Sequence, residues 1–165
     1  MFFERQGYHL PLAPDSAFKD TSTPYEGFAG PGVRFYRTTF NLSLPVPEYD
    51  IPLAIVFTNT SNASSVPESF RSLLYVNGFQ FGKYVNHIGP QLEYPVPEGI
   101  LNYNGENWLG VSLWNMEDGN ATVKLGGFQL KSSSTPTMSG RYRNVSLSYQ
   151  LPQDGWHQRE GYEVY

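Results

Sequence analysis

The acidic side chains are the first candidates for catalysis, because two carboxyl groups about 5 to 9.5 Å apart can serve as acid and nucleophile or base in hydrolysis. The closest pair in the sequence is Glu117-Asp118, directly before Gly119. A Glu-Asp-Gly cluster favours a turn, where both side chains would be solvated. Glu98, before Gly99, has the same setting. We therefore expect no catalytic residue in this chain.

Metal and nucleophile chemistry has equally little support. His9, His87 and His157 lie far apart without a ligand-like spacing, whereas a zinc site needs three or four convergent ligands. The chain has no cysteine, so disulfides, thiolate nucleophiles and cysteine-bound metals are excluded. It also has no Gly-X-Ser-X-Gly stretch that would mark a serine nucleophile. We expect neither a metal nor a cofactor.

The tryptophans of residues 107–115 are candidates for binding. Leu109, Val111 and Leu113 alternate as the apolar face of a strand, so Trp108 and Trp114 point the other way, unless a bulge at the intervening glycine shifts the phase. Such rings can stack on a sugar, contact another domain, or lie under a loop of the same domain. The sequence leaves all three alternatives open.

A second pair of candidate ligand-binding residues flanks a loop. Tyr84 precedes the loop that contains Gly89-Pro90, and Gln91 follows it. Gln91 could donate a hydrogen bond to a sugar hydroxyl beside the tyrosine. In the alternative, which we favour, Tyr84 packs under the loop and Gln91 satisfies backbone groups.

Five Asn-X-Ser/Thr sequons predict exposed, N-glycosylated asparagines in a secreted, extracellular protein. A Ser/Thr/Asn-rich chain also produces such triplets by chance. Residues 1–5 carry charges where a signal peptide would need an apolar stretch, so we expect a fragment of a longer secreted protein. The sequons lie at Asn41, Asn59, Asn62, Asn120 and Asn144.

Charge and hydropathy exclude two classes of partner. The formal net charge is −4 and there is no basic run, which gives no reason to expect binding to nucleic acid or to an anionic membrane. No apolar run approaches the roughly 20 residues of a membrane span.

Alternating hydrophobicity predicts an all-β jelly-roll sandwich of about eight antiparallel strands. Residues 36–44 place Tyr36, Phe40 and Leu42 on one face and Arg37 and Asn41 on the solvent face. Two strands flank an Asn-Gly dipeptide that suits a two-residue hairpin turn. With 165 residues, we expect a single jelly-roll domain with an irregular segment, residues 1–32, packed on it. The remaining predicted strands are 51–57, 73–76, 79–85, 91–96, 108–114, 123–130 with a bulge at Gly126-Gly127, and 142–149.

Several of these segments resemble the galactose-binding-like jelly-roll domains at the C-terminal end of family 35 β-galactosidases. The matching order is a Val-Asn-Gly hairpin, Gly-Lys-Tyr, Gly-Pro-Gln and a Val-Pro strand that leads to the family's Gly-Asn turn, represented here by Asn104-Gly105-Glu106-Asn107. Residues 4–11 and 155–162 resemble fungal members. Val85 departs from the pattern, since many relatives have an aromatic residue there. The matching residues are 76–78, 82–84, 89–91, 96–101 and 104–107.

The resemblance implies a parent enzyme that removes terminal β-galactose with retention, by two glutamates of a (β/α)₈ barrel outside this chain. It implies that this domain braces the catalytic barrel and the other domains of the parent enzyme. It assigns no catalytic residue here, and we expect the isolated chain to be inactive. The alternative is a free-standing galactose- or glycan-binding, lectin-like module.

Overall fold

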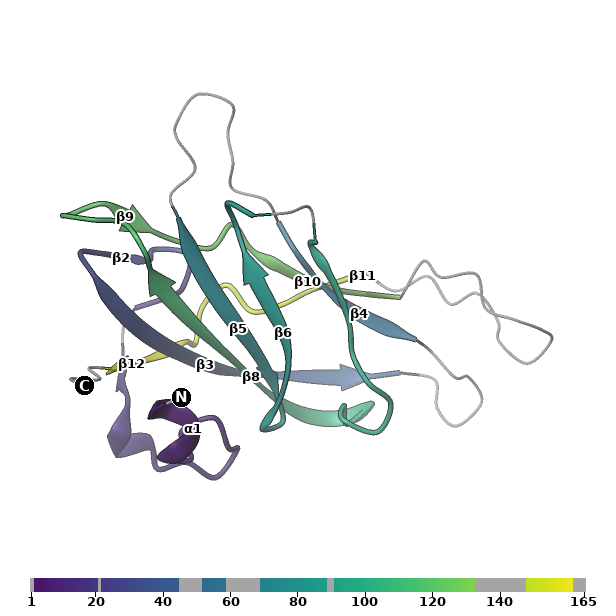
Figure 1. Ribbon diagram of the computed structural model, residues 1–165. Helices are drawn as coiled ribbons and strands as arrows, with labels where there is room; N and C mark the ends of the chain where they lie inside the picture. The colour runs from purple at the N-terminus through teal and green to yellow at the C-terminus, as the bar shows by residue number, and fades with distance from the viewer. Residues whose placement is uncertain are drawn as a thin grey trace.

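Two antiparallel sheets face each other and enclose most of the buried apolar side chains (Figure 1). The computed structural model describes residues 2–20, 22–44, 52–58, 69–88, 91–132 and 148–161. The helical elements are α1 (Phe2–Arg5) and a 3-10 turn (Asp15–Ala17). The strands are β1 (Lys19–Asp20), β2 (Phe28–Ala29), β3 (Gly32–Ser43), β4 (Leu53–Phe57), β5 (Phe70–Val76), β6 (Phe79–Val85), β7 (Glu93–Pro95), β8 (Asn104–Asn115), β9 (Thr122–Val123), β10 (Phe128–Ser132), β11 (Ser148–Gln150) and β12 (His157–Gly161).

The chain crosses repeatedly between the two sheets. The larger sheet has six strands in the order β1-β12-β3-β8-β5-β6, and the smaller sheet has four in the order β11-β10-β4-β7. Strands β2 and β9 form a separate two-stranded sheet. The chain passes from the larger sheet to the smaller after β3, returns after β4, passes again after β6, returns after β7, and passes once more between β8 and β10. These are the connections of a jelly roll. The all-β sandwich prediction is confirmed.

The main core confirms the predicted strand phases. Tyr36, Phe40 and Leu42 of β3 pack inward, as do the alternating Leu and Val residues of β8. Strand β3 pairs with β8 without interruption from Gly32↔Asn115 to Ser43↔Asn104. There is therefore no bulge in this pairing, and the alternation along β8 is preserved.

The predicted hairpin joins β5 and β6. Asn77 has φ 48° and Gly78 has φ 87°, which are the positive values that a two-residue type I′ turn needs at both central positions. The Asn-Gly dipeptide was therefore a sufficient local signal for this turn.

One strand prediction at the C-terminal end is wrong, and one strand there was missed. Residues 123–130 form two strands in different sheets, because β9 pairs with β2 whereas β10 pairs with β4. The Gly126-Gly127 pair thus belongs to a crossing between sheets, and a bulge is not its role. Strand β12 was not predicted, and it pairs with β3. Of the predicted strand 142–149, residues 142–147 lie outside the described part of the chain.

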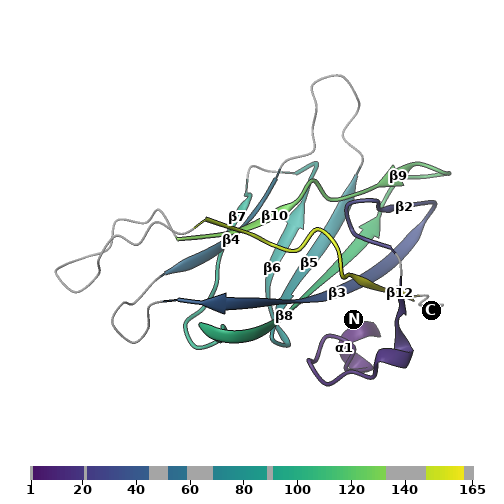
Figure 2. The same cartoon turned by 180° about the vertical axis from the view of Figure 1, so that it is seen from behind.

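The N-terminal segment, residues 2–18, packs on the outer face of the six-stranded sheet, beside β3 and β12 (Figures 1 and 2). Phe3 and Phe18 join Phe35 and Tyr75 in a second apolar cluster on that face. Among the described residues, no helix is long and apolar enough to cross a membrane.

Candidate functional site on the outer face of β8

Trp108 and Trp114 both point away from the main core, as the alternation predicts. They are six residues apart on one strand, which corresponds to about 20 Å. They therefore cannot form one binding platform. Trp108 is half-buried, whereas Trp114 is 40% exposed.

Arg37 is the main departure from the predicted solvent face of β3. Its side chain is buried at 3% exposure because the N-terminal segment covers it. The guanidinium carbon lies 3.9 Å from the ring centroid of Phe18 and 5.0 Å from that of Trp108. The guanidinium also donates to the carbonyl of Ala13 over 2.9 Å and pairs with Asp15. Burial lowers the pKa of Arg37, and the Asp15 carboxylate acts against that shift.

The backbone of Trp108 is fixed by the hairpin turn. Its N–H donates to Oδ1 of Asn77 over 2.7 Å, and its carbonyl accepts the Asn77 N–H over 2.9 Å. The Asn77 side chain also donates to Oδ1 of Asn107, which is fully buried. The turn that carries part of the family resemblance therefore positions Trp108.

A groove with a volume of about 490 Å³ runs beside Trp108. This volume lies within the range of about 300 to 1,000 Å³ that small-molecule sites occupy. Its wall includes an indole, two carboxylates, an imidazole and two hydroxyls, which can stack on a ring and hydrogen-bond to hydroxyl groups. The lining residues are Asp15, Phe18, Thr38, Thr39, Glu106, Trp108, Gly155 and His157.

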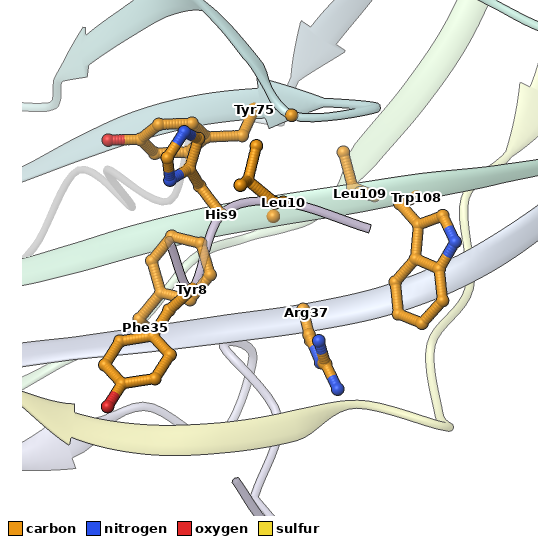
Figure 3. Close-up of a pocket in the computed structure, with 10 residues that line it drawn as sticks. Tyr8, His9, Leu10, Phe35, Arg37, Tyr75, Trp108 and Leu109 are labelled. Atoms are coloured by element: carbon orange, nitrogen blue, oxygen red, sulfur yellow. The ribbon is translucent and has the colours of Figure 1, made fainter. Parts of the chain in front are cut away.

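The other side of Trp108 borders a narrow crevice of about 10 Å³, which is too small for a ligand. Figure 3 shows His9 and Leu10 of the N-terminal segment above the sheet, with Tyr75 on one side and Trp108 on the other. Trp108 thus separates a filled crevice from an open groove.

The carboxylates of the groove are exposed to solvent. Asp15 is 94% exposed and pairs with Arg37, and Glu106 is exposed. Neither has the apolar enclosure that the general acid of a glycosidase requires. No group of three or more His, Asp or Glu side chains that could hold a metal occurs within the described ranges.

Trp114 belongs to a different surface at the far end of β8. It lies directly opposite Arg71, which in turn lies opposite Val85. The Arg71 guanidinium is 5.6 Å from the indole centroid. Ile88 is 64% exposed and Met116 is 37% exposed at the adjoining strand ends. We call Arg71, Val85, Ile88, Trp114 and Met116 the Trp114 patch.

The structure does not bring Tyr84 and Gln91 together with the tryptophans. Tyr84 is 3% exposed and stacks on Phe57 with 4.7 Å between ring centroids. It is a core residue and offers no ring face to a ligand. Gln91 is exposed and does not line the groove.

Two of the sequon asparagines are described, and both are exposed. Asn41 lies on the outer face of β3 and Asn120 in the turn after β8. Asn59, Asn62 and Asn144 lie outside the described residues.

Residues 2–119 match the family of the Beta-galactosidase second all-beta domain. The chain belongs to this family. It is 50% identical over 161 residues to probable β-galactosidase E of Aspergillus fumigatus, with 98% of this chain and 15% of that protein covered. It is 51% identical over 148 residues to β-galactosidase A of a Penicillium species, with 88% and 14% covered. It is 43% identical over 161 residues to β-galactosidase A of Aspergillus oryzae, with 98% of this chain and 14% of that protein covered.

The chain thus spans about 15% of the length of the fungal β-galactosidases that it matches, and the predicted family is confirmed. In this member of the family, the motif residues around the hairpin are structural. A Cβ on Gly82 would lie 3.1 Å from the side chains of Leu74 and Tyr94, and the Tyr94 hydroxyl donates to the Lys83 carbonyl over 2.8 Å. These residues help to define the fold, while Asn77 and Glu106 of the matching residues also contribute to the groove, by fixing Trp108 and by lining the groove wall.

Proposed function

We propose that this chain is a non-catalytic accessory domain of a secreted β-galactosidase, and that it braces the catalytic barrel and other domains of that enzyme. The observation that carries the proposal is the match to a β-galactosidase all-beta domain over residues 2–119, in a chain that covers 15% of the length of a fungal β-galactosidase relative. A domain that occupies so small a share of its polypeptide has other domains in the same chain, and these are the partners that we propose for it.

The Trp114 patch is the proposed bracing surface. It combines an exposed indole, two exposed aliphatic side chains and an arginine, and tryptophan and arginine are enriched at the energetic centres of interfaces. Arg71 already lies over the indole, so this part of the surface is ordered before contact. We assign the patch to another domain of the same polypeptide.

Substitution in the intact parent enzyme tests this assignment. Trp114→Ala should shorten the half-life of the enzyme's activity on heating, because it removes an interface anchor of about 2 kcal/mol or more. The same change should leave the stability of the isolated chain within about 0.5 kcal/mol. Phe79→Ala is the matched control, since Phe79 is 59% exposed at the opposite end of the sheet. Equal effects of the two substitutions on the intact enzyme would contradict the assignment.

The second part of the proposal is that the isolated chain has no hydrolytic activity. Hydrolysis needs an enclosed acid and a nucleophile, and the groove carboxylates are exposed. The isolated chain should therefore not hydrolyse a chromogenic β-galactoside. Turnover that persists after rigorous purification, and that Glu106→Gln or Asp15→Asn abolishes, would refute this.

The groove beside Trp108 supports a finer function, the contact with galactosides. An indole together with Glu106 and His157 offers a stacking surface and hydrogen-bonding partners for hydroxyls. Titration of unglycosylated chain with lactose should shift the Trp108 indole resonance, and Trp108→Ala should remove the response. The alternative, a lectin-like module that acts alone, also requires that the isolated chain give this response to lactose.

Secretion and glycosylation at the sequons complete the proposal. Asn41 and Asn120 are exposed, as acceptor asparagines must be. The same modification is proposed for Asn59, Asn62 and Asn144. Peptide mass spectrometry of the secreted protein measures occupancy at each site.

A further inference from the structure

We propose that the groove beside Trp108 is the seat of the domain's own N-linked glycan on Asn41, whose first N-acetylglucosamine stacks on the indole. This inference deepens the proposed carbohydrate contact of the groove and rests on the proposed secretion. It names the first occupant of the groove as a sugar that is covalently attached to the same chain.

The strand register places the sequon beside the groove. Asn41 lies directly opposite Glu106, and Thr39 lies directly opposite Trp108. All four residues point to the outer face, so Asn41 is the diagonal neighbour of Trp108. Diagonal neighbours are about 7 to 8 Å apart, which long side chains can bridge, and an asparagine that carries a sugar ring is longer than any ordinary side chain.

One face of the indole is covered by Arg37, so an attached sugar would stack on the opposite face. The guanidinium of Arg37 occupies one face of Trp108 at 5.0 Å from the centroid. Arg37 and Asn41 lie on opposite sides of Thr39 along β3. The direction away from Arg37 is therefore the direction of Asn41, where the attached sugar would lie.

The polar groups suit N-acetylglucosamine. Glu106 is exposed and lines the groove directly opposite the attachment point. Its carboxylate can accept hydrogen bonds from the acetamido N–H or from a ring hydroxyl. The C–H face of the pyranose would remove indole surface from water.

Because the sugar is covalently attached to Asn41, even a weak contact with the indole is sufficient to keep it in the groove. A short tether gives an effective concentration of roughly mM, so the attached sugar occupies the groove even where a free sugar would bind poorly. The modification itself transfers an oligosaccharide from a lipid diphosphate donor. The bond between sugar C1 and Asn41 Nδ2 forms, the C1–O bond to the diphosphate breaks, and the amide proton leaves with the lipid diphosphate.

The first test is made on the 165-residue chain, secreted from yeast and trimmed by an endoglycosidase to one N-acetylglucosamine per site. NMR should show Overhauser contacts between the Asn41-linked sugar and the Trp108 indole, with upfield shifts of the sugar protons. Asn120→Gln is the matched control, because Asn120 follows the opposite end of β8 and its loss should leave these contacts intact. An unmodified Asn41, or a modified one without contacts to Trp108, overturns the proposal.

The second test is a double-mutant cycle, which needs no assignment of NMR resonances. Asn41→Gln should raise the unfolding equilibrium constant of the glycosylated chain by about 3- to 10-fold, and Trp108→Leu should remove most of that difference. Trp114→Leu is the control on the same strand face and should leave the difference unchanged. Additive effects of Asn41→Gln and Trp108→Leu overturn the proposal.

Lactose titration separates this inference from the galactoside contact itself. Weaker lactose binding by the glycosylated chain than by its Asn41→Gln variant supports the inference, and equal binding by both forms overturns it. If neither form binds lactose, the galactoside contact fails, and the Overhauser contacts alone decide whether the glycan occupies the groove.

Discussion

Two arginine–tryptophan pairs lie on the outer face of the six-stranded sheet, and their surroundings differ. Arg37 lies 5.0 Å from the Trp108 ring and is 3% exposed, whereas the half-buried Arg71 lies 5.6 Å from Trp114, which is 40% exposed. The N-terminal segment covers the first pair and forms one wall of a groove. The second pair is part of an open surface. The same pair of residue types thus contributes to the wall of a groove at one end and to the proposed interface at the other.

The largest expected difference between the two pairs concerns folding stability. Arg37→Met should lower the free energy of unfolding by about 2 to 4 kcal/mol, because it removes a hydrogen bond to Ala13, the Asp15 pair and two cation–π contacts. Arg71→Met should cost less than about 1 kcal/mol, as expected of a partly solvated contact.

Urea denaturation of the isolated chain at pH 7 measures both values. A loss for Arg37→Met as small as that expected for Arg71→Met would show that the N-terminal segment does not depend on Arg37. The comparison between the two ends would then lose its energetic basis.

The contrast also shows which features the sequence could predict. The phase of β8 and the Asn77-Gly78 turn depend on neighbouring residues, so alternation and turn chemistry were sufficient. The burial of Arg37 depends on Ala13, Asp15 and Phe18, which contact β3 only after folding.

The groove was unpredictable for the same reason. It combines Asp15 with Glu106 and His157, three residues that no local pattern connects. The split between β9 and β10 likewise reflects pairing with strands far away in sequence. The sequence predicted an exposed sequon at Asn41. To predict that Asn41 lies close to Trp108 would have required the register between β3 and β8.

Gly110 lies between the two tryptophans in the sequence, and its substitution should have the next largest effect on the free energy of unfolding. A Cβ there would be 2.9 Å from Cζ of Phe35 and 3.4 Å from Cβ of Tyr75. Gly110→Ala should therefore displace the apolar cluster under the N-terminal segment and cost about 1 to 3 kcal/mol.

Hydrogen exchange locates that effect. The amides of Tyr8 and Phe18, which bond to carbonyls within the N-terminal segment, should exchange faster in the variant. The amide of Phe57 in the other sheet should change less. Uniform acceleration at all three amides would indicate global unfolding and would contradict local displacement.

The tryptophans themselves should differ by a smaller amount in the isolated, unglycosylated chain. Trp108→Leu should cost about 1 to 2 kcal/mol, since the ring packs on Arg37 and fills the border of the crevice. Trp114→Leu should stay within about 0.5 kcal/mol, because Trp114 is already 40% exposed in the folded chain. Thermal unfolding of both variants beside the wild type gives the comparison. A larger loss for Trp114→Leu would reverse the roles assigned to the two ends.

The smallest effect is a pH dependence at the Trp114 end. The Glu117 carboxylate accepts the backbone N–H of Ser69, at the start of β5, and this hydrogen bond lowers the pKa of Glu117 below its usual 4.5. Because the pKa is lower in the folded state, the contact stabilises the fold above the unfolded value. That stability is lost as the pH falls through the lower folded value.

Glu117→Gln should therefore lower the melting temperature slightly at pH 7, and the difference from the wild type should shrink below pH 4.5. The effect is small, because the amide oxygen of Gln can still accept the Ser69 N–H and only the charge is lost. Glu98→Gln is the control, since Glu98 is exposed in a turn away from this contact. A difference that is independent of pH would mean that the charge of Glu117 does not hold the start of β5, and that the Trp114 patch is ordered by the Arg71 contact without it.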